Sequence, residues 1–346
     1  MIKRTLYFGN PSYLSVKNAQ LSVRLPEVES FVSSSLSSRA KSRDENIVTS
    51  SLSSRAESRD EKPTQYKRDA VATIPVEDIG IVVIDHPQIT LTSGLLQALQ
   101  ENNVAVIICD NRHMPQSLLL PIEGNSIQQE RYDAQLAASE PLKKQLWQQT
   151  VMQKIKNQAA ALDSLNLQSD YLTPLHRNVK SGDTDNCEAT AAVYYWQTIF
   201  VKHVPEFKRI ARIQGVQNVT PPAPNNYLNY GYAILRATMA RSIVAAGLLP
   251  TLGIFHKNRY NAYCLADDLM EPYRPYVDQI VHQMIAEMGI TDDMTKEHKA
   301  ILLKIPAIDV SIDGEKSPLM LATQRTAVSM VKCFNGEQRK ILYPEL

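Results

Sequence analysis

The hydrophobic pattern of the chain changes near residue 128, and this change constrains the fold more than any other feature. Before it, apolar residues fall in short runs of strand length, such as 79–84 and 104–109. After it, they recur at three- and four-residue spacing, as at Ala192, Tyr195 and Ile199, which is typical of amphipathic helices. With 346 residues, the chain is long enough for two cores. The sequence therefore predicts an α+β protein in which a small N-terminal β-rich domain precedes a larger all-α domain.

The expected domain boundaries follow from the same change of pattern. The best marked element of the second part is an apolar helix that begins at Asn225 and stops at Gly247, with Pro250 beyond it. An extended break is expected at 308–314. The predicted units are a β-rich domain over 1–112, a linker over 113–127 and a helical domain over 128–346.

A serine-rich segment at about 32–66 interrupts the β-rich part. Within it, residues 35–45 nearly repeat as 51–61. One such repetition is too short and too polar for a solenoid, which generally needs three or more units with an apolar face. We expect a flexible, low-complexity insertion or hairpin tip that is dispensable for catalysis.

Several features argue against membrane, disulfide-rich and nucleotide-binding classes. No run of about 18 apolar residues occurs, so no membrane span is expected. The N-terminus lacks the apolar core and cleavage site of a secretory signal, which favours a cytoplasmic location. The four cysteines form no C-x-x-C pair, so neither a zinc knuckle nor a disulfide framework is predicted. No phosphate-binding loop, dinucleotide fingerprint or His-Glu-x-x-His zinc motif is present.

The formal net charge of +1 restricts any binding to nucleic acid. Phosphate contacts depend on cations, so a DNA site on this chain must be a local basic patch. The alternative for any single cation is a helix face that simply lies in water. The candidate patches are Lys143 and Lys144 with Lys154 and Lys156; Lys202 and His203 with Lys208, Arg209 and Arg212; and Arg236 and Arg241 with Lys257 and Arg259.

Candidate metal ligands lie in three separate segments. Asp268 and Glu271 have the i, i+3 spacing that places two side chains on one side of a helix, and His256 precedes them. Pro272 interrupts the backbone hydrogen bonds of that helix, a local cost that is typical of sites where geometry matters. Glu188 lies in the first turn of another predicted helix. One imidazole with two carboxylates suits Mg²⁺ or Mn²⁺ better than a soft metal.

Each of these residues also has a structural explanation when it is taken alone. Glu188 could stabilise its helix through the helix dipole, by about 0.3 to 1 kcal/mol. His256 could be an ordinary histidine that flanks a helix. Asp268 and Glu271, together with Asp267, could form a solvated helix face. The residue types and their spacing are therefore compatible both with a metal site and with these structural roles.

Four segments together resemble the Cas1 family, the CRISPR-associated endonucleases and integrases that insert new spacers into CRISPR arrays. They are the helix with Glu188, the segment 225–232, the turn 253–258 and the acidic segment 268–275. The acidic segment is similar to the form found in systems with a single large RNA-guided effector nuclease. The resemblance extends from Leu6 to about residue 340, interrupted by the serine-rich insertion.

The resemblance implies metal ligands at Glu188, His256 and Glu271 in a catalytic helical domain. Many members have Asp at the third position, so the choice between Glu271 and Asp268 stays open. Asp268 is then either a supporting group or an alternative ligand. The implied reaction is a transesterification in which a 3′-hydroxyl of a short DNA duplex attacks a phosphate at the repeat boundary. With water as the nucleophile, the same site would hydrolyse DNA.

The resemblance also implies partners. The protein would bind double-stranded protospacer and repeat DNA as a homodimer, and two dimers would clamp a smaller companion subunit in a heterohexamer. The effector nuclease is a further candidate partner. Candidate DNA-binding residues are Lys257, Asn258 and Arg274 beside the predicted ligands, Arg236 and Arg241 in a basic patch, and Tyr230 in the segment 225–232.

Two other functions are compatible with these residues in part. A structure-selective nuclease for branched DNA would use the same residues without integration. A non-catalytic DNA-binding scaffold would need none of Glu188, His256 and Glu271. Because all three are present, we expect a metal-dependent DNA integrase and endonuclease.

Overall fold

The computed structural model describes residues 3–27, 66–211, 220–291 and 293–346. The serine-rich insertion predicted at about 32–66 lies outside these residues, except for Tyr66. Tyr66 pairs with Pro26 in an antiparallel bridge, and the backbone N–H of Lys67 donates to the carbonyl of Leu25 at 2.9 Å. The described chain therefore leaves and re-enters the fold at neighbouring points. No helix in the described residues is long and apolar enough to cross a bilayer.

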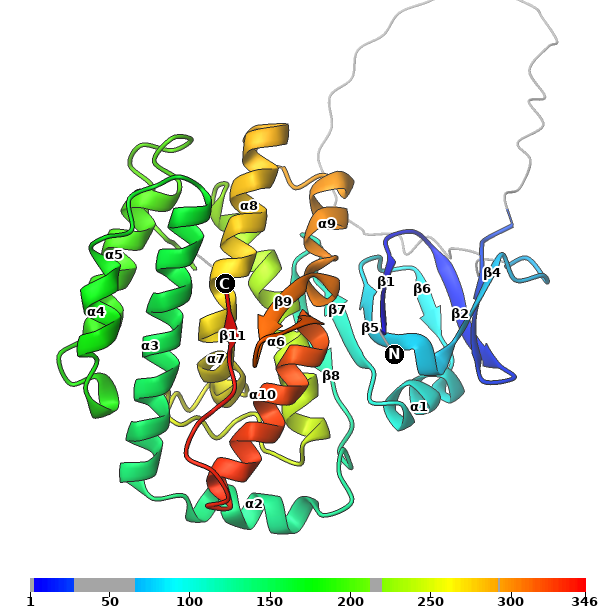
Figure 1. The fold of residues 1–346 in the computed structure, drawn as a ribbon. Coiled ribbons are helices and arrows are strands. Elements are labelled where there is room, and N and C mark those ends of the chain that lie inside the picture. The colour runs from blue at the N-terminus through cyan, green and yellow to red at the C-terminus, as the bar shows by residue number, and fades with distance from the viewer. Residues whose placement is uncertain (1–2, 28–65, 212–219, 292) are drawn as a thin grey trace, which may run out of the picture.

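The N-terminal part contains two four-stranded sheets (Figure 1). The strands of the first run in the order β1 (Arg4–Phe8), β5 (Ile79–Ile84), β7 (Ala105–Cys109) and β8 (Pro115–Leu119). Those of the second run in the order β4 (Ala72–Pro75), β3 (Gln20–Arg24), β2 (Ser12–Lys17) and β6 (Ile89–Leu91). A short 3₁₀ turn, η1 (Val76–Asp78), leads into β5, and helix α1 (Ser93–Glu101) precedes β7. In the first sheet, β5 is parallel to both β1 and β7, and β8 is antiparallel to β7.

Strand β5 is buried along its whole length because its two faces belong to different cores. Val82 and Ile84 pack with α1 and the second sheet, whereas Ile81 and Val83 pack against the helical part. A strand that is covered on both sides has a continuous run of apolar residues, and the sequence of β5, IGIVVI, is such a run.

Part of the expected linker over 113–127 is a strand. Residues Pro115–Leu119 form β8, which pairs with β7 at the edge of the first sheet. The sequence of this segment, PQSLL, does not alternate polar and apolar residues, so the pattern gives little indication of a strand. The division of the chain into domains at residue 112 stays a prediction.

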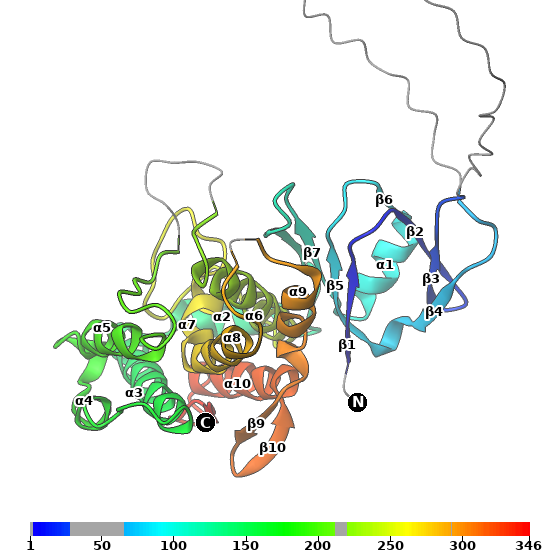
Figure 2. The ribbon, with the colours of Figure 1, turned by 90° about the horizontal axis from the view of Figure 1, so that it is seen from above.

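The second part is mainly helical, which confirms the predicted fold class (Figure 2). Its first elements are α2 (Gln128–Ala137), α3 (Glu140–Ser164), α4 (Leu172–Asn178), η2 (Ser181–Asp183) and α5 (Cys187–Ile199). They are followed by α6 (Asn225–Ala245), α7 (Cys264–Met270), η3 (Glu271–Tyr273), α8 (Arg274–Met288), α9 (Lys296–Leu302), η4 (Ile305–Ala307) and α10 (Leu319–Phe334). Helix α6 is buried over most of its length and contacts α7, α8, α9 and α10. It is therefore the centre of the helical core.

A small sheet accompanies the helices. It consists of β10 (Glu315–Pro318), β9 (Asp309–Ile312) and β11 (Pro344–Glu345), in that order. The extended break expected at 308–314 corresponds to β9 and the turn that follows it. The C-terminal strand β11 brings the end of the chain against α3.

Candidate active site

Helix α3 provides one wall of the candidate site. Trp147, which is 1% exposed, stacks on Phe255 with 4.2 Å between ring centroids and an angle of 2° between the planes. Nearly three turns further along α3, Asn157 donates to the carbonyl of Pro272 at 2.7 Å and to that of Pro344 at 2.9 Å. These contacts fix the turn with His256 and the segment with Glu271 to the same helix.

Glu188 is positioned by the cap of helix α5. The carboxylate of Asp183 accepts the backbone N–H of Cys187 at 2.8 Å and that of Glu188 at 3.0 Å, so it satisfies two amides that the helix leaves unpaired. Asn186 takes a left-handed backbone conformation with φ of 56°, which turns the chain into the helix. Glu188 thereby faces α3 with a side chain that is 22% exposed.

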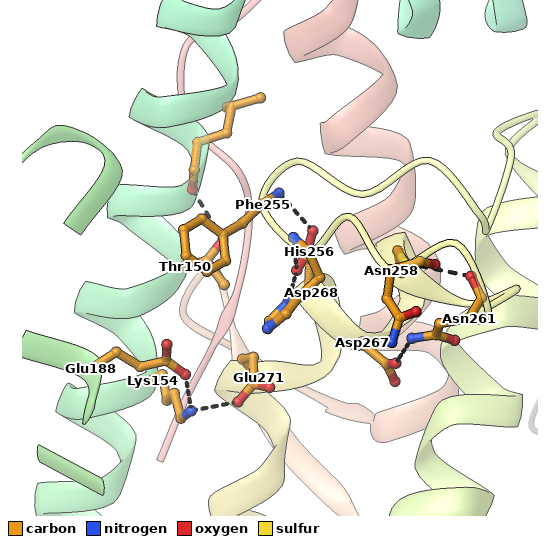
Figure 3. A network of polar contacts seen from close by, with 12 residues as sticks. Thr150, Lys154, Glu188, Phe255, His256, Asn258, Asn261, Asp267, Asp268 and Glu271 are labelled. Atoms are coloured by element: carbon orange, nitrogen blue, oxygen red, sulfur yellow. Dashed lines mark hydrogen bonds and ion pairs between the residues drawn. The ribbon is translucent and has the colours of Figure 1, made fainter. Parts of the chain in front are cut away.

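The turn that contains His256 is organised by Asp268, on α7. The carboxylate of Asp268 accepts the backbone N–H of Phe255 at 2.9 Å and that of His256 at 3.3 Å, and it also contacts Nδ1 of His256 (Figure 3). The side-chain hydrogen bond with Asp268 raises the pKa of His256 above its usual value. Gly253 is required by this packing, because a Cβ there would lie 2.5 Å from the His256 carbonyl oxygen and 2.7 Å from Oδ2 of Asp268.

Glu271 lies where the helix is interrupted. Helix α7 ends at Met270, and Glu271 begins the 3₁₀ turn η3, in which Pro272 cannot donate a backbone hydrogen bond. The side chain of Glu271 is 5% exposed, and one of its oxygens lies 2.9 Å from the guanidinium of Arg274. Burial alone would raise the pKa of Glu271, but the charges of Arg274 and Lys154 hold it below its usual value.

Lys154 joins the two glutamates. Its Nζ lies 2.5 Å from Oε1 of Glu188 and 2.6 Å from Oε2 of Glu271 (Figure 3). Burial alone would lower the pKa of Lys154, but Glu271 and Glu188 raise it above its usual value. Two carboxylates from different elements thus converge on one cation in a largely buried position.

The predicted ligand set fits a hard divalent cation in its chemistry. The ammonium of Lys154 stands in for a cation between Glu188 and Glu271, and the negative charges of both glutamates act on the His256 imidazole. Oxygen and imidazole donors suit Mg²⁺ or Mn²⁺. Within the described residues, however, no three His, Cys, Asp or Glu side chains are close enough to hold a metal ion in this conformation.

The predicted DNA-binding residues separate into exposed and buried ones. Lys257 has a side chain that is 66% exposed, and Asn258 is also exposed. Arg236 is 42% exposed and donates to Asp267 at 2.6 Å. Arg274 is 27% exposed and is paired with Glu271.

Tyr230 and Arg241 are wrong as direct DNA contacts. Tyr230 is 0% exposed and Arg241 is 3% exposed, because both lie on the central helix α6. Nε of Arg241 donates to the carbonyl of Asn103, next to β7. In this conformation Arg241 connects the N-terminal sheet to the helical core, and neither side chain reaches the surface.

Lys154 was missed as a member of the site. The sequence groups it with Lys143, Lys144 and Lys156 in a candidate basic patch, yet it is 9% exposed. Its spacing indicates a buried position, because Thr150 and Asn157 lie four residues before it and three after it, on the same buried side of α3. The partners of a buried lysine cannot be read from that spacing.

Comparison with known proteins gives one family. The family model described as "CRISPR associated protein Cas1" matches residues 54–312. A curated relative named CRISPR-associated endonuclease Cas1, from Neisseria meningitidis serogroup C (strain 8013), is 36% identical over 279 residues, which covers 79% of this chain and 87% of the relative.

Two solved structures share the fold. A structure titled "Casposase bound to integration product" has a TM-score of 0.70 at 19% sequence identity, covering 99% of this chain and 92% of that one. A chain of a "Cas6-RT-Cas1--Cas2 complex" has a TM-score of 0.65 at 17% identity, covering 99% of this chain and 36% of that one. At these identities the likeness is one of fold.

Proposed function

The chain belongs to the Cas1 family of CRISPR-associated endonucleases, and we propose that it is a metal-dependent DNA integrase. It would join the 3′-hydroxyl ends of short protospacer DNA to the CRISPR repeat by transesterification. The observation that carries this proposal is the meeting of Glu188 and Glu271, from separate elements, at one cation beside the ordered turn of His256.

The side chains would divide the work as follows. Glu188, Glu271 and Nε2 of His256 would hold the metal ion, and Asp268 would orient the imidazole through Nδ1. When bound, Mg²⁺ or Mn²⁺ would stabilise the negative charge that develops on the phosphoryl oxygens. Because the oxygens of Asp268 already accept two backbone amides and the imidazole, we assign the third ligand to Glu271 and a supporting role to Asp268.

The proposed reaction exchanges one phosphodiester for another. The 3′-oxygen of the incoming DNA forms a bond to phosphorus at the repeat boundary, and the bond to the repeat's own 3′-oxygen breaks. The attacking hydroxyl loses a proton and the leaving oxygen gains one, so no external energy source is needed. Lys257, Asn258 and Arg236 would contact DNA phosphates near the site, as their partly or fully exposed side chains allow.

The names of the similar structures support the partners that we propose. One neighbour is bound to an integration product, and another lies in a complex that includes Cas2. We propose that this chain binds protospacer and repeat duplexes and forms homodimers, two of which hold a smaller companion subunit in a heterohexamer. The effector nuclease is a further proposed partner.

Strand transfer tests the function directly. A short duplex with 3′-hydroxyl ends is incubated with a repeat-containing plasmid and Mn²⁺, and wild type is compared with His256→Ala. His176→Ala, which changes a histidine outside the site, is the matched control. We expect joined products with wild type and the control only. Plasmid cleavage without joining would indicate a structure-selective nuclease, and DNA retention without any chemistry would indicate a scaffold.

A further inference from the structure

Lys154 occupies the place between the two glutamates that a bound metal ion would need. Resting on the proposed function, we propose that Lys154 is an internal counter-cation, which neutralises Glu188 and Glu271 in the metal-free protein and must be displaced when a divalent cation binds. The contacts of 2.5 and 2.6 Å direct one oxygen of each glutamate at Nζ.

The charges explain why a counter-cation is needed. The side chain of Glu271 is 5% exposed and that of Glu188 is 22% exposed, so two neighbouring carboxylates would repel each other in a poorly hydrated place. Arg274 offsets one negative charge from the far side of Glu271, and Lys154 offsets the other. The four side chains are therefore neutral as a group, and the site can fold without metal.

The same contacts oppose a metal ion while Lys154 stays in place. Mg²⁺ binds oxygen ligands at about 2.0–2.1 Å. An ion held by both glutamates would therefore lie in nearly the same place as Nζ, which is 2.5 and 2.6 Å from their oxygens. An added divalent ion would also meet a like charge at contact distance. Metal binding and the present position of Lys154 therefore exclude each other.

The lysine has the means to leave. Its charge is carried on a flexible four-carbon stem, and the side chain is 11% exposed. Helix α3 and the glutamates are anchored by other contacts, Asn157 to Pro272 and Asp183 to the start of α5. Departure of the Lys154 side chain would free this position, and the side chains of Glu188, Glu271 and His256 would then draw closer together around a metal ion.

Lys154→Met tests the inference, because methionine keeps the apolar length and removes the charge. Mn²⁺ affinity of the full chain is measured by titration calorimetry without DNA, and the melting temperature is measured in chelator and in excess Mn²⁺. We expect Lys154→Met to bind Mn²⁺ at least about tenfold more tightly than wild type, to melt at a lower temperature in chelator, and to gain more from Mn²⁺.

The matched control is Lys156→Met. Lys156 lies on the same helix, is 47% exposed and pairs with Glu345, so its replacement should leave Mn²⁺ affinity unchanged. If Lys154→Met does not fold in chelator, Lys154→Gln, which keeps an N–H donor without the charge, replaces it in the titration. Mn²⁺ affinity that is equal to or weaker than wild type, while joining by wild type still requires metal, overturns this inference alone. Joining by wild type that is unaffected by chelator overturns the proposed function.

Discussion

The carboxylate of Asp268 closes the turn that carries His256. It accepts the backbone N–H of His256 at 3.3 Å and contacts Nδ1 of the same residue, which leaves Nε2 on the far edge of the ring. One buried acid thus sets both the backbone path and the ring orientation of the predicted metal ligand. The two roles explain why Asp268 is completely buried, although it lies three residues from Glu271 on an acidic segment.

Asp268→Asn should lower strand transfer by about 10- to 100-fold with a smaller effect on folding, a range typical of groups that orient metal ligands. Asparagine keeps the size of the side chain but replaces one carboxylate oxygen with an NH₂ group. That group is a donor and cannot accept the N–H groups that the oxygen accepts in wild type. Joining rate and Mn²⁺ affinity are the measurements. Asp267→Asn is the control, since Asp267 binds Arg236 and Asn261 instead. Equal losses in the two variants would contradict the positioning role of Asp268.

Gly253→Ala should damage the same turn through its backbone. The added methyl group would lie 2.5 Å from the carbonyl oxygen of His256 and 2.7 Å from Oδ2 of Asp268, so the turn must shift. We expect a loss of about 1–3 kcal/mol in the free energy of unfolding, together with loss of joining. Urea unfolding and strand transfer check both.

Gly94→Ala provides the comparison for that variant. Gly94 lies on helix α1, where an added Cβ meets only Val16 at 3.7 Å, an ordinary contact. Alanine is about 0.5–1 kcal/mol better than glycine within a helix, so this variant should be as stable as wild type or more stable. A Gly253→Ala protein with unchanged stability and activity would show that the turn is not tightly packed.

Much of the fold could be predicted from periodicity. The apolar run 79–84 appears as β5, and the three- and four-residue spacing at Tyr195 and Ile199 appears as α5, because burial on both faces and burial on one face leave different patterns. The interruption at Pro272 also follows from local chemistry, since proline lacks the amide that a helix needs. Such features depend on neighbours in sequence.

Other features depend on residues distant in sequence and could not be predicted. The burial of Arg241 depends on the carbonyl of Asn103, and the position of Lys154 depends on Glu188 and Glu271. In each case a charged side chain on a helix has its partner on another element. Helical spacing assigns such a side chain to a face, and only the tertiary structure shows whether that face meets water or an acid.

Lys299→Met should strongly destabilise the contact between the N-terminal sheet and α9. Nζ of Lys299 lies 2.7 Å from Asp85, and the two side chains are 8% and 0% exposed. Removal of one partner from a buried ion pair costs about 3–5 kcal/mol, because the other charge is left unpaired. Tyr7 and His113 still contact Asp85 but do not replace the full charge.

Urea unfolding of three variants checks the Lys299 prediction. Asp85→Asn combined with Lys299→Met removes both charges, so the double variant should be more stable than Lys299→Met alone. A double variant whose loss equals the sum of the two single losses would argue against an energetic link between Asp85 and Lys299.

The pH dependence of stability should reveal the buried acid Asp278. Burial raises its pKa to about 7, although hydrogen bonds from Tyr232 and Tyr195 and the charges of Arg209 and Arg274 favour the ionised form. The unfolded chain has a pKa near 3.9 at this residue. Between these values the folded state keeps a proton that the unfolded state has lost, so the contribution of Asp278 to stability falls as pH rises from about 4 to about 7.

Asp278→Asn isolates that contribution, because asparagine is neutral at every pH. The difference in unfolding free energy between the variant and wild type should therefore shift in favour of the variant across this window, by up to about 4 kcal/mol. Thermal or urea unfolding at half-unit steps of pH measures it. Asp170→Asn changes an exposed acid, so its curve of unfolding free energy against pH should be parallel to that of wild type. If the Asp278→Asn curve is also parallel, the carboxyl group is ionised throughout, and the buried hydrogen bonds from Tyr195 and Tyr232 outweigh its desolvation.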